Sequence, residues 1–186
     1  MALSPNHMSR NYSSPIFSPT KNTEIPKPFF IGVCGGPASG KTEVCDKITG
    51  KLEEIAKAEN LGQRVAVVNM DSFYKKLTPE NLERAKNGTY NFDHPDAFDD
   101  EAMYKALVKI QQGEPVTVSS YDYVNNQPNA NDTKEIAKAD VVLVEGILVF
   151  YYEKILDLFN LKLFVETDSE SRLVKRSKYN ILTFDA

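Results

Sequence analysis

Short apolar runs alternate along the chain with stretches in which apolar residues recur at every third or fourth position. The runs predict buried strands at residues 29–34, 64–70, 139–146 and 161–167. The pattern between them predicts helices at 40–60, 79–87 and 99–112, with another beginning near Asp168. Strands that alternate with helices favour an α/β fold, in which helices cover both faces of a parallel sheet.

Two stretches depart from this alternation. Residues 114–126, EPVTVSSYDYVNN, alternate between polar and apolar positions and predict a small β-hairpin arm. Residues 1–27 are rich in Ser, Pro and Asn and lack the apolar core of a secretory signal, so we expect them to form a flexible N-terminal tail.

The composition of the chain bears on which kinds of partner the protein can bind. The 186 residues carry a net charge of −4, which provides no overall basic field for a long nucleic acid. No apolar stretch of the sequence is long enough to span a bilayer. The two cysteines, Cys34 and Cys45, have neither the pattern of a disulfide framework nor the spacing of a metal site. We therefore expect a cytoplasmic protein with no nucleic-acid or membrane partner.

A glycine-rich segment, GGPASGKT, follows the first apolar run and precedes the first predicted helix. It matches the phosphate-binding pattern G-x-x-x-x-G-K-[ST] in the strand-to-helix context that this pattern requires. Its glycines let consecutive backbone N–H groups approach an anion, and the helix N-terminus adds partial positive charge. Lys41 can bridge the terminal phosphates and Thr42 can offer its hydroxyl to Mg²⁺. The nucleotide-binding residues predicted here are Gly35, Gly36, Pro37, Ala38, Ser39, Gly40, Lys41, Thr42 and Glu43.

Two carboxylates stand at the ends of other predicted strands. Glu145 follows four apolar residues in VVLVEG and is the candidate group for Mg²⁺ or its water shell. Asp71 follows the run that ends in VVNM. Ligands of open parallel sheets bind at the carboxyl ends of the strands, so both carboxylates are expected to face the nucleotide. Asp71 could alternatively be the N-cap of the DSFY turn.

The sequence resembles the uridine-cytidine kinases over residues 28–176. The motifs GGPASGKT, DSFY, NFDHPDAFD, YDY, VEGILVFY and KLFVETDSESRL occur in that family's order, and NFDHPDAFD (91–99) is the most specific of them. The resemblance implies the P-loop kinase fold and ATP·Mg²⁺-dependent phosphorylation of the 5′-hydroxyl of uridine or cytidine. The product would be UMP or CMP in pyrimidine salvage, and the assembly a homotetramer.

The resemblance also implies individual roles. Asp71 would be the general base, acting with Lys41 and Arg176 as the catalytic residues. Asp93 would accept hydrogen bonds from the ribose hydroxyls, although turn chemistry before His94-Pro95 is an alternative. Phe92 and Tyr121 would be walls of the base pocket, and Arg176 would lie beside the transferred phosphate.

The sequence departs from the family pattern at two places. Where the family has a base-reading histidine, this chain has Asn126, whose amide also carries a donor and an acceptor and is the expected contact to the base. After Arg176 the family continues into an arginine-rich lid, whereas this chain reads SKYNILTFDA. We therefore expect an incomplete kinase domain at 28–176 and a divergent tail at 177–186, as in a truncated or alternatively spliced form.

Two other functions stay open at the level of the sequence. The same fold serves kinases of other small alcohols, such as phosphoribulokinase and pantothenate kinase. The missing lid arginines would instead suit a catalytically impaired nucleotide-binding isoform or regulatory subunit.

Overall fold

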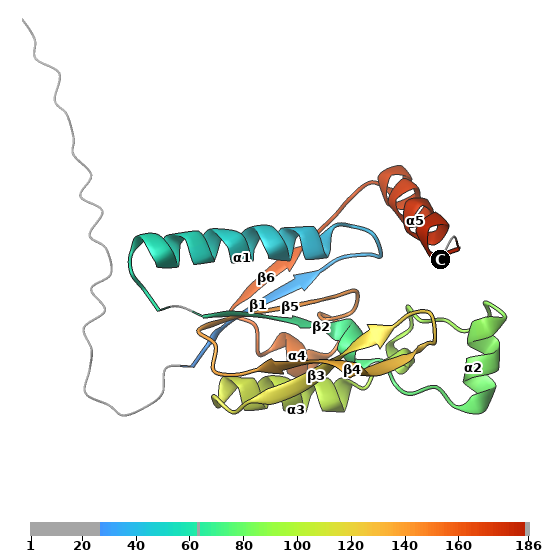
Figure 1. The fold of residues 1–186 in the computed structure, drawn as a ribbon, viewed down its shortest axis with the longest axis horizontal. Helices are drawn as coiled ribbons and strands as arrows, with labels where there is room; N and C mark the ends of the chain where they lie inside the picture. Colours follow the sequence, from blue (N-terminus) through green and yellow to red (C-terminus); the bar gives the residue numbers. More distant parts are fainter. Residues whose placement is uncertain (1–26, 63, 185–186) are drawn as a thin grey trace, which may run out of the picture.

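A parallel sheet built from the four apolar runs lies at the centre of the molecule (Figure 1). The computed structural model describes residues 27–62 and 64–184, so the predicted tail, apart from Lys27, lies outside the described residues. The strands are β1 (Phe29–Cys34), β2 (Val65–Asn69), β5 (Val141–Gly146) and β6 (Leu161–Phe164), in the order β2-β5-β1-β6. All neighbouring pairs run parallel, which confirms the predicted α/β class.

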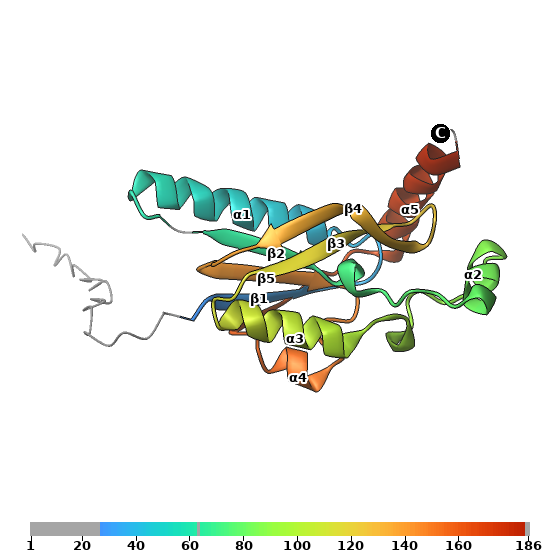
Figure 2. The same cartoon turned by 60° about the horizontal axis from the view of Figure 1, so that its bottom comes forward.

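The helices cover both faces of this sheet (Figure 2). They are α1 (Lys41–Ala58), α2 (Pro79–Lys86), α3 (Asp100–Gln111), α4 (Glu153–Leu156) and α5 (Ser169–Phe184). Helix α1 packs on one face, and α3 and α4 lie on the other. None of the helices in the described ranges is both long and apolar enough to cross a membrane.

Local side-chain caps explain where several helices begin. The hydroxyl of Thr78 accepts a hydrogen bond from the Asn81 N–H at 3.2 Å, just before α2. The carboxylate of Asp99 caps α3 by accepting from the Ala102 N–H at 2.9 Å. Asp168 caps α5 in the same way. Each cap satisfies a backbone donor that the helix leaves without an internal partner.

The pleat of the strands divides the core into two parts. On one face, Ile31 and Val33 of β1 and Leu143 of β5 pack against α1 around Cys45. On the other face, alternate residues of the same strands join a larger cluster with α3 and the chain after β5. That cluster includes Phe30, Val142, Val144, Met103, Leu107, Ile110 and Phe159. Because both faces of β1 and β5 are buried, these two strands read as continuous apolar runs. The expectation of a buried strand at 161–167 is wrong, since β6 lies at the edge of the sheet and is largely exposed.

The hairpin arm is longer than the sequence indicates. Its strands are β3 (Val116–Asp122) and β4 (Gln127–Ile136), so the stretch 114–126 supplies the first strand and the turn. The returning strand is almost entirely polar and exposed, with Ile136 as its buried residue. A register shift between Ser119 and Ser120 also interrupts the pairing. Without apolar alternation, β4 gave no strand signal.

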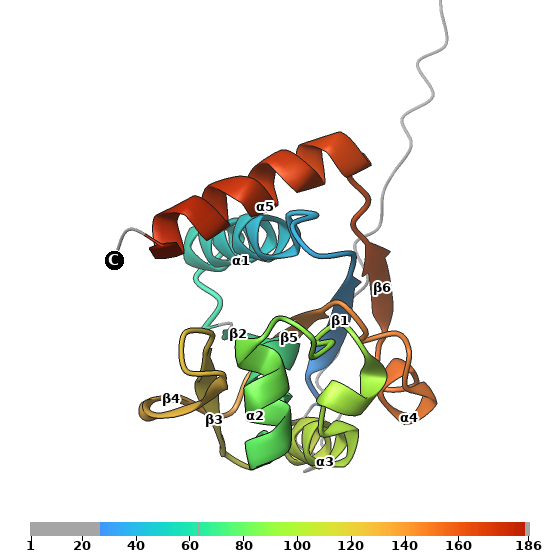
Figure 3. The ribbon, with the colours of Figure 1, turned by 90° about the vertical axis from the view of Figure 1, so that its right-hand side faces the viewer.

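The segment that the sequence sets apart as a divergent tail continues a helix. Helix α5 runs from Ser169 to Phe184 without a break after Arg176. Figure 3 shows it crossing beside the N-terminal end of α1. Residues 185–186 lie outside the described residues.

Gly32 in β1 allows the side chains of the larger cluster to pack closely against the strand. A Cβ at Gly32 would lie 2.6 Å from a ring atom of Phe150 and 2.7 Å from one of Phe159. We expect Gly32→Ala to lower the free energy of unfolding by about 1–3 kcal/mol through overpacking. The matched control is Gly50→Ala in the middle of α1, where nothing lies within 4 Å of the added atom.

The control should have the opposite sign, because alanine in an open helical position stabilises by about 0.5–1 kcal/mol. Urea unfolding of both variants measures the two effects. Equal stability of Gly32→Ala and the unmodified protein would contradict the close packing of β1.

Candidate active site

The glycine-rich loop lies between β1 and α1, at the carboxyl end of the sheet. Gly40 stands before the helix at φ 92°, in the left-handed region that favours glycine. The amino group of Lys41 donates to the carbonyl oxygen of Gly36 at 3.0 Å, so its side chain folds back over the loop. From the other side, the hydroxyl of Thr167 donates to the carbonyl oxygen of Ser39 at 2.8 Å. The loop is therefore held in shape before any phosphate binds.

The carboxylate of Glu145 lies between the ends of three strands. Register pairs it with Val33 of β1 and with Asn69 of β2. The hydroxyl of Thr42 donates to its Oε2 at 3.0 Å, and the Asn69 amide donates to its Oε1 at 3.3 Å. The side chain is only 3% exposed, and this burial raises the pKa of Glu145. Carboxylate and hydroxyl oxygens are ligands of the kind that Mg²⁺ prefers.

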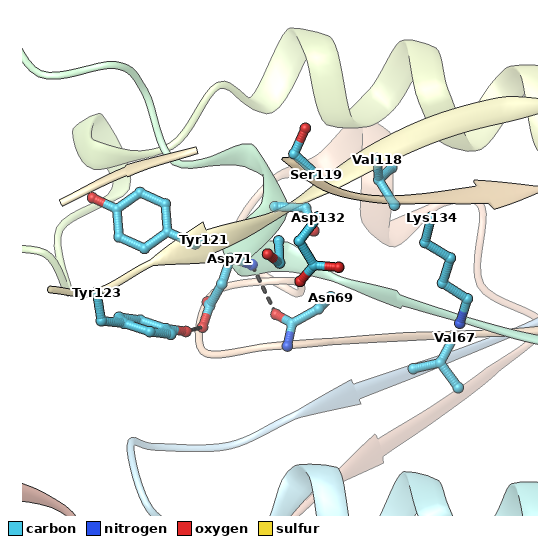
Figure 4. A pocket seen from close by; sticks show the side chains of 11 residues that line it. Val67, Asn69, Asp71, Val118, Ser119, Tyr121, Tyr123, Asp132 and Lys134 are labelled. Carbon is cyan, nitrogen blue, oxygen red and sulfur yellow. Dashed lines mark hydrogen bonds between the residues drawn. The ribbon is translucent and has the colours of Figure 1, made fainter. Parts of the chain in front are cut away.

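Asp71 follows β2 in the short 3₁₀-helix η1 (Met70–Phe73). Asn69, and not Asp71, caps this turn: its side-chain oxygen accepts from the Asp71 N–H at 2.8 Å. The alternative interpretation of Asp71 as the cap is therefore wrong, and its carboxylate is left to face the site. The hydroxyl of Tyr123 donates to Asp71 Oδ2 (Figure 4). Burial raises the pKa of Asp71, and the Tyr123 hydrogen bond and the Lys41 charge oppose that rise.

Two cavities lie near this carboxylate and share Tyr123 as a lining residue. The first, of about 560 Å³, lies at the glycine-rich loop and is lined by Pro37, Ala38, Gly40, Lys41, Thr42, Glu43, Tyr123, Lys175 and Arg176. The second, of about 400 Å³, is bounded by β2 and the hairpin (Figure 4). Asp71 and Tyr121 are among the residues that line it, and Tyr123 lines both cavities. We call them the donor cavity and the acceptor cavity.

Cations of α5 lie against the loop. Arg176 lines the donor cavity, as does Lys175, which the sequence analysis did not single out. Arg172 lies closer still, since a Cβ on Gly36 would be 2.5 Å from its guanidinium. Helical residues three or four positions apart share one face, and Lys175 and Arg176 stand three and four positions after Arg172. This spacing is the sequence signal that predicts all three cations on the same side of the helix.

Aromatic rings form a wall near the acceptor cavity. Tyr74 contacts Phe92 with ring centroids 5.8 Å apart and Tyr121 with centroids 4.7 Å apart. Asp93 lies on the exposed turn beside this wall, and its charge contributes to raising the pKa of Asp71. The Asp93 N–H is bonded by the Asn91 side chain at 3.0 Å, so Asn91 provides the turn chemistry and the Asp93 carboxylate is not needed for it.

Asn126 occupies a different kind of position. It lies in the hairpin turn at φ 53°, where Asn is among the favoured residues, and it is not among the residues that line these two cavities. The hairpin instead presents Ser119, Asp132 and Lys134 to the acceptor cavity. Alternation along β4 puts Asp132 and Lys134 on one face, a signal that could be used only once the strand was known.

The buried carboxylate of Glu145 makes a prediction about stability and pH. Its pKa is raised above the ordinary value of 4.5, so the ligand-free protein loses stability as the pH rises through that pKa. Glu145→Gln removes the ionisation and keeps an oxygen for Thr42. We therefore expect the melting temperature of this variant, relative to the unmodified protein, to increase between pH 5 and pH 8.

Glu53→Gln, an exposed position of α1, is the control and should show no such pH-dependent gain. Thermal unfolding in the absence of nucleotide and Mg²⁺ measures the difference. A relative melting temperature that falls with rising pH would contradict the effect of burial on Glu145.

Comparison with known proteins gives consistent matches along most of the chain. Residues 30–180 match the model of the phosphoribulokinase / uridine kinase family. The chain is 47% identical over 152 residues to uridine-cytidine kinase 2-B of Danio rerio, covering 82% of this chain and 58% of that protein. It is 42% identical over 174 residues to the uridine/cytidine kinase UKL1, chloroplastic, of Arabidopsis thaliana, covering 93% of this chain and 34% of that protein. The chain thus spans less than two thirds of the length of either relative.

Solved structures resemble the fold. A putative fructose transport system kinase from Silicibacter sp. TM1040 has a TM-score of 0.67 at 19% identity, covering 86% of this chain and 75% of that chain. A possible uridine kinase from Bacillus stearothermophilus has a TM-score of 0.56 at 16% identity, covering 82% and 78% respectively. At these identities the likeness concerns the fold alone, which is that of P-loop kinases. The family match extends over most of the described residues, and the chain belongs to the phosphoribulokinase / uridine kinase family.

Proposed function

We propose that this protein transfers a phosphoryl group from ATP to the 5′-hydroxyl of uridine or cytidine, giving UMP or CMP. The observation that carries the proposal is the position of Asp71, which lines the acceptor cavity and approaches the donor cavity through Tyr123. Membership of a P-loop kinase family implies ATP and typically Mg²⁺. The names of the relatives support a pyrimidine nucleoside as the acceptor.

The donor side of the proposed reaction is electrostatic. The backbone N–H groups of the glycine-rich loop and the start of α1 would bind the phosphates, with Lys41 bridging the terminal ones. Lys175 and Arg176 line the same cavity and would offset charge on the transferring group. Thr42 and Glu145 would hold Mg²⁺, which neutralises phosphate charge when bound. Their contact and the raised pKa of Glu145 are consistent with a bound cation. A positive charge at this place would lower the free-energy cost of burying the ionised carboxylate.

The acceptor side depends on proton transfer. Asp71 would take the proton of the 5′-hydroxyl as its oxygen attacks the γ-phosphorus. Its carboxylate must be ionised for this role, and its pKa is raised, so activity should increase with pH until Asp71 is deprotonated. Asp93 would accept from the ribose hydroxyls, and Phe92 and Tyr121 would flank the base. Asn126 as a base contact would require the hairpin turn to move toward the acceptor.

A direct assay tests the function. ADP release and nucleotide formation are measured with ATP, Mg²⁺ and either uridine or cytidine. The matched control acceptor is 5′-deoxyuridine, which has the same base and ribose hydroxyls but lacks the attacking group. Ribulose 5-phosphate and pantothenate test the acceptors of other P-loop kinases. UMP or CMP formation is the expected result, and phosphorylation of ribulose 5-phosphate or pantothenate alone would contradict the proposal.

Asp71→Asn should lower kcat far more than it weakens nucleoside binding, because the general base acts as the transition state forms. The expected loss of kcat is about 10²–10⁴-fold, the usual contribution of general acid-base catalysis. Steady-state kinetics with uridine, together with calorimetric binding of uridine, separate the two effects. Near-normal turnover would show that another group takes the proton.

Lys41→Ala should abolish the thermal stabilisation by ATP·Mg²⁺ while leaving the nucleotide-free melting temperature close to that of the unmodified protein. Lys41 contacts the loop and not the apolar core, so the fold does not depend on it. Lys47→Ala, which removes an exposed pair with Glu43 on the same helix, is the control and should retain the nucleotide-induced shift. An unchanged shift in Lys41→Ala would contradict its contact with the phosphates.

A further inference from the structure

Tyr123 has an unusual position for an exposed aromatic residue. It follows β3 in the hairpin turn, and its side chain is 64% exposed. Its hydroxyl nevertheless donates a hydrogen bond to Asp71 Oδ2, and its side chain lines both the donor and the acceptor cavity. Figure 4 shows the ring reaching from the hairpin to that carboxylate. Tyr123 is therefore shared by the two cavities.

An attacking hydroxyl must satisfy the same two conditions. It has to donate its proton to Asp71, and it has to face the phosphate held by the glycine-rich loop. The Tyr123 hydroxyl already donates to Asp71, and Tyr123 lines the cavity that Lys41 and Thr42 also line. The phenol and an acceptor hydroxyl thus compete for one proton-accepting oxygen.

We propose that Tyr123 is a gate that occupies Asp71 until an acceptor hydroxyl displaces it, and thereby prevents Asp71 from activating water against bound ATP. The inference rests on the proposed function, because it takes Asp71 as the base and ATP as the donor. Without the phenol, a water molecule would hydrate the free carboxylate oxygen beside the phosphate. Its attack on the γ-phosphorus would release ADP and inorganic phosphate, with the water proton passing to Asp71.

The surroundings of Tyr123 suit a side chain that moves. Its ring contacts Tyr121 edge-on at a centroid distance of 5.2 Å, and the next residue, Val124, is 80% exposed. The ring can therefore leave Asp71 without opening the core. Although most of the Tyr123 surface is exposed, desolvation where its hydroxyl meets Asp71, together with the charge of Asp71, raises the pKa of Tyr123. The phenol therefore keeps its proton and is a weak nucleophile itself.

The experiment removes only the hydroxyl. Tyr123→Phe is compared with Tyr151→Phe, a control of similar exposure (62%) whose ring stacks edge-on against Tyr152 and is not among the residues lining either cavity. ADP release is measured with ATP and Mg²⁺ in the absence of nucleoside. Uridine and cytidine affinities are measured by calorimetry in the presence of a non-hydrolysable ATP analogue.

Tyr123→Phe should raise nucleoside-independent ADP release by about tenfold, the rate change expected when one charge-assisted hydrogen bond no longer protects the base. It should also tighten nucleoside binding, because the acceptor no longer displaces a phenol. The ratio of ADP released to nucleotide formed should increase, a change that a merely structural role of the ring would not produce. Tyr151→Phe should leave all three quantities unchanged.

Two results would overturn the gate. One is a Tyr123→Phe protein whose ADP release and nucleoside affinity both equal those of the unmodified protein. The other is an added phosphoryl group on Tyr123 in the intact mass after incubation with ATP·Mg²⁺, since the phenol would then be an acceptor and not a block. Failure of the proposed function gives a different result. The unmodified protein would then release ADP in the presence of uridine or cytidine without forming UMP or CMP. The calorimetric comparison decides the gate even where turnover is too slow to measure.

Discussion

The buried carboxylate of Glu145 is the constraint on which the site depends. Parallel register brings the ends of β1, β5 and β2 together, so this side chain meets Thr42 from the loop after β1 and Asn69 from β2. Burying a negative charge there is unfavourable unless a positive charge balances it. The ligand-free protein therefore holds a destabilised group at the place where a metal-nucleotide complex would provide that balance.

Asn69 extends this constraint to the catalytic candidate. Its amide nitrogen contacts Glu145, and its amide oxygen fixes the backbone of Asp71. One side chain thereby contacts both Glu145 and the backbone of Asp71. No sequence motif identifies Asn69, since an amide at the end of a strand is common. Its two contacts form only when the neighbouring strands are in place.

The sequence was sufficient where the physical signal was local. Continuous apolar runs such as 29–34 predicted the sheet, and the motif ending in Lys41-Thr42 predicted a loop between a strand and a helix, because both patterns are set by neighbouring residues. The sequence was insufficient where a position depends on contacts between elements that are far apart in the chain. The polar strand β4 has no apolar alternation, and Lys175 and Arg172 lie at the loop only because α5 passes beside it. Asn126 stays a predicted base contact, and its place in the hairpin turn was not evident from the sequence.

In β4, the residue that supports the core differs from the residues that line the acceptor cavity. Of the ten residues of β4, only Ile136 is buried, so most of this strand can change without opening the core. The same strand supplies Asp132 and Lys134 to the acceptor wall. Substitutions there would alter the acceptor at little expense of folding free energy, whereas the phosphate loop is fixed by the central sheet. The acceptor cavity is therefore lined in part by residues on which the core does not depend.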